Sequence, residues 1–367
     1  MRFPSLLELT PDQQAIIDLP FDGCHLVTGP PGSGKTVMAV YRAWMLATAG
    51  REAILITHSN LLNQYTTQFS ALDSSGLRIT TFHRWLRTFW QESFDSMPPS
   101  DGQDEWSYDW LLMESETIRN RLTSSTYLVI DEGQDLPLGF YELCSTLESH
   151  ITVFADEDQR IGEKQSTLSE ITRELGVHNK PFVMPTNHRT TREVALLASR
   201  YRVGANYADL PLPERGGVKP CLIHSSSPPR FLTQLSQYIQ AHPERRIGVL
   251  CRTTQLQREI QLQLAENGLE SSVQAYISND VNRRSMDFTQ HRVQIVNIAS
   301  MKGLEFDSVF VPDLDFYSED PSSADIRMRF HVLCTRARDE LYFGYFGQRE
   351  PAIIADVPES VLERREG

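Results

Sequence analysis

The chain has 367 residues, of which 40% are hydrophobic and 23% charged, and it contains 20 glycines and 20 prolines. This composition is typical of a globular protein and excludes collagen-like and disordered chains. A chain of this length usually forms more than one hydrophobic core, so we expect two domains. No apolar run is long enough to span a membrane, and the first residues lack the apolar core of a signal peptide, so we expect a cytoplasmic protein.

The charge balance and the cysteines constrain the function further. Lys and Arg number 35 against 48 Asp and Glu, which gives a formal net charge of −13. A protein that holds nucleic acid mainly by neutralising phosphates is usually basic, so any such contact must lie in a local groove. The five cysteines are scattered without a C-x-x-C pair, which argues against a structural zinc site or a disulfide framework.

Short apolar runs alternate with helical patterns along the chain, which predicts an α/β fold with parallel sheets. The first series of predicted strands covers residues 25–29, 53–57, 77–82, 127–131 and 151–155. The second series covers residues 246–251, 293–299, 308–312 and 340–346, with helices near 229–241 and 254–266. Two similar sheets are therefore expected, in domains at 1–180 and 181–367.

An acidic segment interrupts the first series of strands. Residues 91–117, within an expected short insertion at about 88–120, carry eight Asp or Glu and no Lys or Arg, together with Trp106 and Trp110. The simpler interpretation is a solvated acidic loop with an aromatic side chain packed beneath it. The alternative is a docking surface for a basic partner protein.

The sequence GPPGSGKT matches the pattern G-x-x-x-x-G-K-[ST] and lies between a predicted strand and a predicted helix, as a phosphate-binding loop requires. Its glycines let backbone N–H groups turn toward phosphate oxygens, and the helix N-terminus adds favourable partial charge. We expect Lys35 to reach the β- and γ-phosphates of a nucleotide and Thr36 to ligate Mg²⁺. The residues predicted to bind the nucleotide here are Gly29, Pro30, Pro31, Gly32, Ser33, Gly34, Lys35 and Thr36.

Acidic residues follow two of the predicted strands. YLVIDEGQD places Asp131 and Glu132 at the end of an apolar strand, where carboxylates are costly unless they meet a metal and a water. Asp131 would then hold Mg²⁺, and Glu132 would be the base that activates the attacking water. The alternative is a helix N-cap cluster. The next strand ends in FADEDQ, which places Asp156, Asp158 and Gln159 beside the same site, where Gln159 would sense the γ-phosphate.

Taken in chain order, these segments resemble the motifs of the UvrD/Rep/PcrA-like superfamily 1A DNA helicases. The similar segments are LTPDQQ (9–14), GPPGSGKT (29–36), ITHSN (56–60), TTFHRW (80–85), IDEGQD (130–135), FADEDQRI (154–161), NHRTTRE (187–193), ASMKGLEFDSVFV (299–311) and LCTRARDELYF (333–343). The resemblance covers nearly the whole chain. It implies two RecA-like P-loop NTPase domains, with ATP and Mg²⁺ bound in the cleft between them.

The resemblance also implies roles for individual residues. Gln13 would read the adenine edge, although Thr10 and Gln13 have the spacing of a capping box, which is an equal alternative. Glu305 would contact the ribose. Arg189 and Arg336 would be two arginine fingers, which act when the domains close around ATP. The residues implied in a nucleic-acid groove are His58, Asn60, Thr81, His83, Ser300 and Lys302.

The chain also departs from the family pattern. Thr36 and Asp131 are only 95 positions apart, which leaves no room for the large 1B insertion of the family. Arg189 and Lys302 are 113 positions apart, which likewise excludes a large 2B insertion. Position 188 is His where the family commonly has Tyr, and the stretch QRIGEKQST (159–167) contains no aromatic residue to stack on a base. We therefore expect a minimal two-domain core.

Three hypotheses for the function remain open. The first is an ATPase motor in which domain closure drives movement on single-stranded DNA, or on RNA, with DNA favoured by the resemblance. The second is an ATP-driven regulatory or sensor subunit of a multi-protein system, such as bacterial phage defence, with little or no unwinding by itself. The acidic segment and the missing aromatic residue favour this second hypothesis. The third, a small-molecule or nucleotide kinase, leaves the two arginine fingers unexplained.

Overall fold

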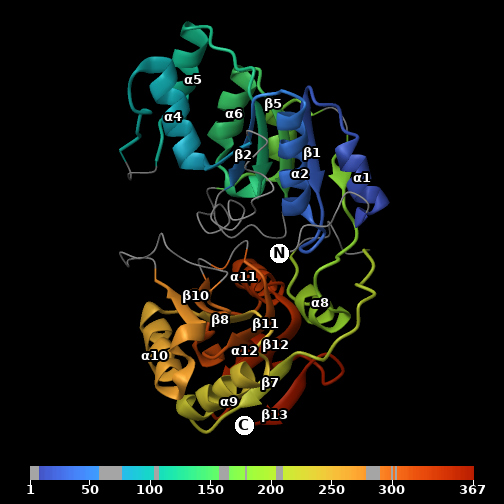
Figure 1. The fold of residues 1–367 in the computed structure, drawn as a ribbon, viewed down its shortest axis with the longest axis vertical. Helices are drawn as coiled ribbons and strands as arrows, with labels where there is room; N and C mark the ends of the chain where they lie inside the picture. Colours follow the sequence, from blue (N-terminus) through green and yellow to red (C-terminus); the bar gives the residue numbers. More distant parts are fainter. Residues whose placement is uncertain are drawn as a thin grey trace. The chain divides into compact units, whose positions relative to one another are not determined.

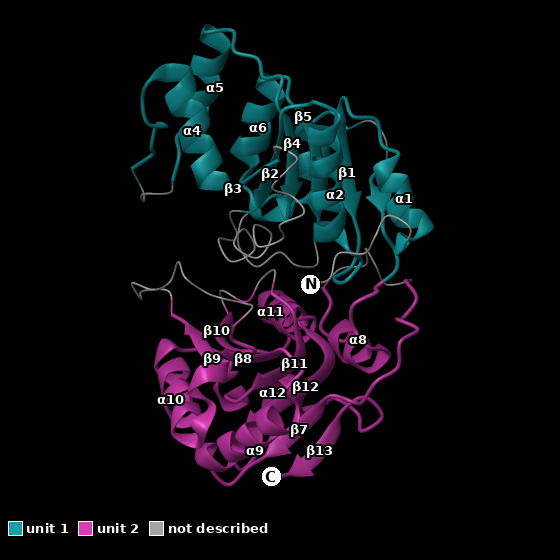
Figure 2. Cartoon of the chain, in the orientation of Figure 1, with its two compact units in different colours: residues 1–186 teal, residues 187–367 magenta. Residues whose placement is uncertain are grey.

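The computed structural model divides the chain into two compact units, Met1–Thr186 and Asn187–Gly367 (Figure 2). The division lies a few residues after position 180, because residues 182 and 183 join the sheet of unit 1. The residues that the structure describes are 8–57, 77–102, 107–156, 165–177, 180–203, 210–277, 290–298, 301 and 304–367. The predicted fold class, two α/β domains with parallel sheets, is confirmed.

Unit 1 is built on a sheet of parallel strands (Figure 1). Its strands are β1 (Cys24–Thr28), β2 (Ala53–Thr57), β3 (Arg78–Thr81), β4 (Tyr127–Asp131), β5 (His150–Ala155) and β6 (Phe182–Val183). They are ordered β3-β2-β4-β5-β1-β6. Strands β2 and β4 lie in the interior of the sheet and are buried along their whole length, which explains their nearly continuous apolar sequences.

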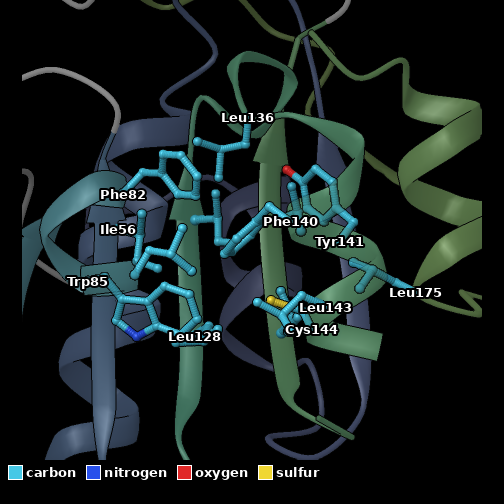
Figure 3. Close-up of a cluster of buried hydrophobic side chains, with 14 of the residues drawn as sticks. Ile56, Phe82, Trp85, Leu128, Leu136, Phe140, Tyr141, Leu143, Cys144 and Leu175 are labelled. Atoms are coloured by element: carbon cyan, nitrogen blue, oxygen red, sulfur yellow. The ribbon is translucent and has the colours of Figure 1, made fainter. Parts of the chain in front are cut away.

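Helices cover both faces of this sheet. They are α1 (Pro11–Ile17), α2 (Lys35–Thr48), α4 (Phe82–Phe94), α5 (Trp110–Arg119), α6 (Leu138–Thr146) and α7 (Leu168–Glu174). Helices α1 and α2 share one hydrophobic core with the strands, which includes Met38, Leu55 and Val129. Helices α4 to α7 form a second core on the other face, where Trp85 and Phe140 pack together (Figure 3). Unit 1 is therefore a three-layer sandwich.

Much of the acidic segment is helical, so its interpretation as a solvated loop is wrong for the end of α4 and for α5. The expected packed aromatic side chain is present, because the Trp110 ring stacks on Phe82 with 6.2 Å between ring centroids. A Cβ on Gly139 of α6 would collide with the same indole. Trp106 lies outside the described residues. The insertion is thus attached to unit 1 through an aromatic core.

Unit 2 has a second sheet, in which neighbouring strands are again parallel. Its strands are β7 (Cys221–His224), β8 (Ile247–Cys251), β9 (Val273–Tyr276), β10 (Val293–Asn297), β11 (Phe306–Val311), β12 (Ala337–Tyr345) and β13 (Glu363–Glu366). They are ordered β13-β7-β12-β11-β8-β10-β9. The edge strand β13 has the sequence ERRE, and its charges discourage pairing with another chain.

Helices also cover both faces of the second sheet. They are α8 (Arg192–Ser199), α9 (Pro228–Ala241), α10 (Thr254–Leu264), α11 (Ala324–Cys334) and α12 (Ala352–Ala355). Tyr342 of β12 packs against Tyr238 of α9, whereas the next residue, Phe343, stacks on Phe330 of α11. Because successive side chains of a strand point to opposite faces, α9 and α11 lie on opposite sides of the sheet. None of the described helices is long and apolar enough to cross a membrane.

Candidate active site

The parallel strands of unit 1 bring distant residues to one edge of the sheet. Thr57 ends β2 and is the register partner of Asp131, which ends β4. On the other side of β4, β5 ends at Ala155, and Asp156 follows. Ala155 is in turn the register partner of Thr28, after which the 29–36 loop begins. The carboxyl edge of this sheet therefore gathers the residues that the sequence analysis assigned to nucleotide chemistry.

The backbone of the 29–36 loop requires glycine at three positions, the first of which in chain order is Gly29 and the second Gly32, with φ +85°. Gly34, at the N-cap of α2, has φ +94°, a conformation that side chains with a Cβ rarely adopt. A Cβ on Gly29 would meet the Met184 carbonyl oxygen and would lie 2.8 Å from Ser33 Oγ. The loop leads directly into the N-terminus of α2, whose first N–H groups have no partner within the helix. The buried residues of the loop are Gly29, Pro30, Pro31, Gly32, Ser33 and Lys35.

Lys35 is buried, and its ammonium group has three partners. It donates to the Gly29 carbonyl at 2.6 Å and to the Pro30 carbonyl at 3.1 Å. It also lies 3.1 Å from Asp156 Oδ2, and the Asp156 side chain is fully buried. A buried ammonium needs such compensation because its desolvation is costly. The sequence placed Asp156 beside the site, and the structure makes it a direct partner of Lys35.

Asp131 is a buried carboxyl group with an incomplete set of partners. Burial raises its pKa to about 7, and the neighbouring Glu132 carboxylate contributes to this rise. A hydrogen bond from the Thr36 side chain and the charge of Lys35 act in the opposite direction. Asp131 Oδ2 has no hydrogen-bond partner among the described residues. The ionised form would therefore be stabilised by a cation next to Oδ2.

The remaining unpartnered atoms indicate which cation fits. Ser33 Oγ and Thr57 Oγ1 are also buried and have no hydrogen-bond partner among the described residues. Each such group costs about 1 to 3 kcal/mol unless a ligand or water satisfies it. Within the described ranges, no group of three or more His, Cys, Asp or Glu could hold a metal by itself. Oxygen donors with a single carboxylate suit Mg²⁺ that arrives with phosphates, and Thr36 and Asp131 would hold it.

Glu132 lies in a turn that is held by its neighbours. Its φ of +55° is left-handed, which is uncommon for a residue other than glycine. A Cβ on the next residue, Gly133, would collide with Val153 of β5. The Tyr141 hydroxyl of α6 donates to the Gly133 carbonyl at 2.6 Å. Strained backbone of this kind is maintained only where the surroundings fix it, as they commonly do at functional sites.

Gln134 links the Glu132 turn to the segment that follows β5. Its Nε2 donates to Glu132 Oε2 at 2.6 Å, and its Oε1 accepts the N–H of Asp156 at 2.9 Å. Its backbone carbonyl accepts the N–H of Ser166 at 3.2 Å. The sequence analysis did not single out Gln134, although a polar residue two positions after Glu132 in IDEGQD was a visible signal. Gln159, the predicted γ-phosphate sensor, lies outside the described residues.

Gln13 forms the capping box that the sequence offered as one of its two roles. The Thr10 N–H donates to Gln13 Oε1 at 3.1 Å, and the Gln13 N–H donates to Thr10 Oγ1 at 3.4 Å. The side chain is buried, and its Nε2 lies 2.9 Å from the place of a Cβ on Gly34. Gln13 therefore caps α1 and also lies beside the 29–36 loop, and its contact with adenine stays a prediction.

In unit 2, the structure brings together the residues that the resemblance assigned to the nucleotide. Arg189 forms an ion pair with Glu305, and both side chains are largely buried. Arg336 is buried, and its guanidinium donates to the Val332 carbonyl at 3.0 Å and to the Leu304 carbonyl at 3.3 Å. Because Leu304 precedes Glu305, all three predicted residues lie in one cluster. The role of either arginine as a finger stays a prediction.

Only two of the residues expected in a nucleic-acid groove are described. Thr81 ends β3 and occupies the N-cap position of α4 without a side-chain capping bond. His83 is half-buried, its Nδ1 lies 3.1 Å from the Tyr108 hydroxyl, and its ring lies 4.8 Å from the ring of Phe82. The remaining four, His58, Asn60, Ser300 and Lys302, lie outside the described residues. The groove therefore stays a prediction.

Comparisons with known proteins relate only part of the chain to a protein family. Among curated proteins, none is similar enough to count as a match. The C-terminal domain of a possible DNA helicase from Lactobacillus plantarum WCFS1 is 18% identical with a TM-score of 0.36, over 49% of this chain and 99% of that one. An Arterivirus nonstructural protein 10 (helicase) is 13% identical with a TM-score of 0.42, over 92% of this chain and 61% of that one. Residues 12–164, less than half of the chain, match a family model described as an AAA domain, and over this range unit 1 is similar to that family.

Proposed function

We propose that the chain is an ATP-hydrolysing motor of the superfamily 1A helicase type that moves on single-stranded DNA. The observation that carries this proposal is the convergence of Lys35, Asp131 and Glu132 at one sheet edge. Buried oxygen atoms that have no hydrogen-bond partner among the described residues lie at the same edge. The match of residues 12–164 to an AAA domain supports the assignment of a nucleotide to this edge.

Each residue of the edge has a role in this proposal. Lys35 and the N–H groups of the 29–36 loop would bind the phosphates of ATP. Thr36 and Asp131 would hold Mg²⁺, which when bound neutralises phosphate charge and orients the group that is transferred. Glu132 would accept a proton from the attacking water, and Gln134 would orient the Glu132 carboxylate for this step.

Unit 2 would couple hydrolysis to movement. Arg189 and Arg336 would neutralise the charge that develops on the phosphoryl group when the two units close on ATP. Glu305, the ion-pair partner of Arg189, would then exchange that contact for the ribose. Closure on ATP and opening on product release would step the motor along the strand, which Thr81 and His83 would help to hold.

The substitution Glu132→Gln tests the catalytic assignment. We expect the variant to bind ATP with unchanged affinity and to hydrolyse it about 100 to 10,000 times more slowly, because the general base is lost. Glu148→Gln is the matched control, since Glu148 also has a φ of +55° but is exposed on another turn of unit 1. Hydrolysis by Glu132→Gln at the wild-type rate would show that the base is another residue.

The surface of α5 favours a second candidate function, a regulatory or sensor subunit that docks on a basic partner. Leu111 and Ile118 lie two turns apart on α5 and are 79% and 59% exposed. Glu114 of α5 lies near Glu142, whose pKa is raised by burial and by the carboxylates of Glu174 and Glu114. The two candidates differ in what stimulates hydrolysis, a nucleic-acid strand or a partner protein. Leu111→Asp should leave stimulation by a strand unchanged and abolish stimulation by a partner.

A further inference from the structure

Thr57 is a buried residue whose hydroxyl has no structural role within the described part of the chain. It is the last residue of β2 and is 2% exposed. Its Oγ1 has no hydrogen-bond partner among the described residues, although most buried hydroxyls have one. A valine would fill the same place in the strand at a lower desolvation cost. Within the described part of unit 1, the hydroxyl is therefore a polar group that the packing does not require.

The position of Thr57 suggests what the hydroxyl serves. Its register partner on the adjacent strand is Asp131, so the two side chains point to the same face of the sheet. Leu55 and Val129, two positions earlier on the same strands, pack in the core that α2 covers. Thr57 and Asp131 therefore continue this row on the α2 side, where Thr36 hydrogen-bonds to the Asp131 carboxyl. Asp131 Oδ2 has no hydrogen-bond partner among the described residues either.

We propose that Thr57 is a positioning residue for the Mg²⁺ of the nucleotide and holds a water of its hydration shell on the β2 side of Asp131. This inference rests on the proposed function, because it needs a metal at Asp131. Neighbouring strands lie about 4.8 Å apart, whereas a direct Mg–O bond measures about 2.1 Å. A residue one strand away from the metal-binding carboxylate is thus placed to reach a metal-bound water, and Mg²⁺ usually keeps several of these.

Two variants separate this role from a structural one. Thr57→Val removes the hydroxyl at nearly constant volume, and Thr57→Ser keeps it. Thr117→Val is the matched control, because Thr117 is also buried in unit 1 but its hydroxyl donates to the Met113 carbonyl at 2.9 Å. For each protein, the measurements are the unfolding midpoint without ligand, the ADP affinity in EDTA, and the Mg²⁺ affinity by titration calorimetry of ADP-saturated protein.

We expect Thr57→Val to unfold at or above the wild-type temperature without ligand, since it removes a buried hydroxyl that has no partner among the described residues. Its ADP affinity in EDTA should be unchanged, and its Mg²⁺ affinity in the presence of ADP should fall about 3- to 10-fold, as expected for one hydrogen bond. Thr57→Ser should retain most of the Mg²⁺ affinity. Thr117→Val should lower the unfolding midpoint and leave Mg²⁺ affinity unchanged.

Two results would overturn the inference, and they differ in what else they overturn. If Thr57→Val binds Mg²⁺ like the wild type, the hydroxyl does not serve the metal, and the proposed ATPase stands. If the wild-type protein shows no Mg²⁺-dependent binding of ADP, the inference and the proposed function both fail.

Discussion

Lys35 Nζ lies 3.1 Å from Asp156 Oδ2, and this buried ion pair ties the start of α2 to the end of β5. The same ammonium donates to the carbonyl groups of Gly29 and Pro30, so one carboxylate and two loop carbonyl groups compensate its charge. A bound phosphate would compete with these three groups for the Lys35 ammonium. The pair is therefore both a part of the fold of unit 1 and a part of its proposed chemistry.

A double-mutant cycle tests the stabilising part of this relationship. Asp156→Asn and Lys35→Met should each lower the free energy of unfolding by about 3 kcal/mol, because each leaves one buried charge without its partner. The double variant should lose less than the sum, with a coupling energy of about 1 to 3 kcal/mol in urea unfolding. Additive losses would mean that the two side chains do not depend on one another.

Gln134→Leu tests the orientation of the proposed base. The substitution removes the hydrogen bond to Glu132 and the acceptor of the Asp156 N–H. We expect kcat for ATP hydrolysis to fall about 10-fold or more, with the dissociation constant for ATP changed less than about twofold, because catalytic groups need close positioning. Gln165→Leu is the control, since it removes a neighbouring hydrogen bond, from Gln165 Nε2 to Asp135 Oδ1. A similar kcat for the two variants would contradict the role of Gln134.

Arg42 is a buried cation that joins α2 to the segment after α1. Its guanidinium donates to the Leu19 carbonyl at 2.7 Å and to the carbonyl of Pro20, and burial lowers its pKa to about 10. Arg42→Met should lower the free energy of unfolding by about 2 to 3 kcal/mol, because the carbonyl group of the buried Leu19 and that of Pro20 lose their donor. Arg42→Lys should lose less, since it restores one donor. Equal stability of all three proteins in urea would show that these hydrogen bonds contribute nothing.

Asp313, buried at the carboxyl end of β11, predicts a pH dependence of stability. Burial raises its pKa to about 6, from about 3.8 for an ordinary aspartate. The unfolded chain therefore ionises first as pH rises, so this carboxyl group favours the folded state below pH 4 and loses that contribution as pH rises through 6. The loss should amount to about 1 to 3 kcal/mol. The free energy of unfolding of Asp313→Asn should vary less between pH 4 and 7, and a profile parallel to the wild type would contradict this assignment.

The sequence predicted most interior strands and the edge strand β3, but it missed the interior strand β7 and three edge strands. β2 and β4 carry five-residue runs that are almost entirely apolar because both of their faces are covered, and the predicted ranges match. The structure adds β6, β7, β9 and β13, which the sequence analysis did not identify. β6 has only two residues and β13 is made of charged residues, so neither has a hydrophobic period to recognise.

The individual residues of the candidate site were largely predictable, but their mutual contacts were not. Lys35, Asp131 and Glu132 belong to motifs whose chemistry can be stated from residue type and spacing. The contact of Lys35 with Asp156 depends on which strands are neighbours and on how far each one extends, which only the register of the sheet decides. The role of Gln134 arises in the same way, from a side chain that bridges two loops.

Steady-state ATP hydrolysis by the purified chain, with and without single-stranded DNA, tests the central claim most directly. Lys35→Ala provides the blank, and an RNA strand of the same length tests the choice of nucleic acid. The account predicts Mg²⁺-dependent hydrolysis that single-stranded DNA raises about tenfold or more and that the blank lacks. Hydrolysis that no strand stimulates would move the assignment to the regulatory subunit. Hydrolysis no faster than the Lys35→Ala blank, with or without a strand, would contradict the claim that this chain is an ATPase.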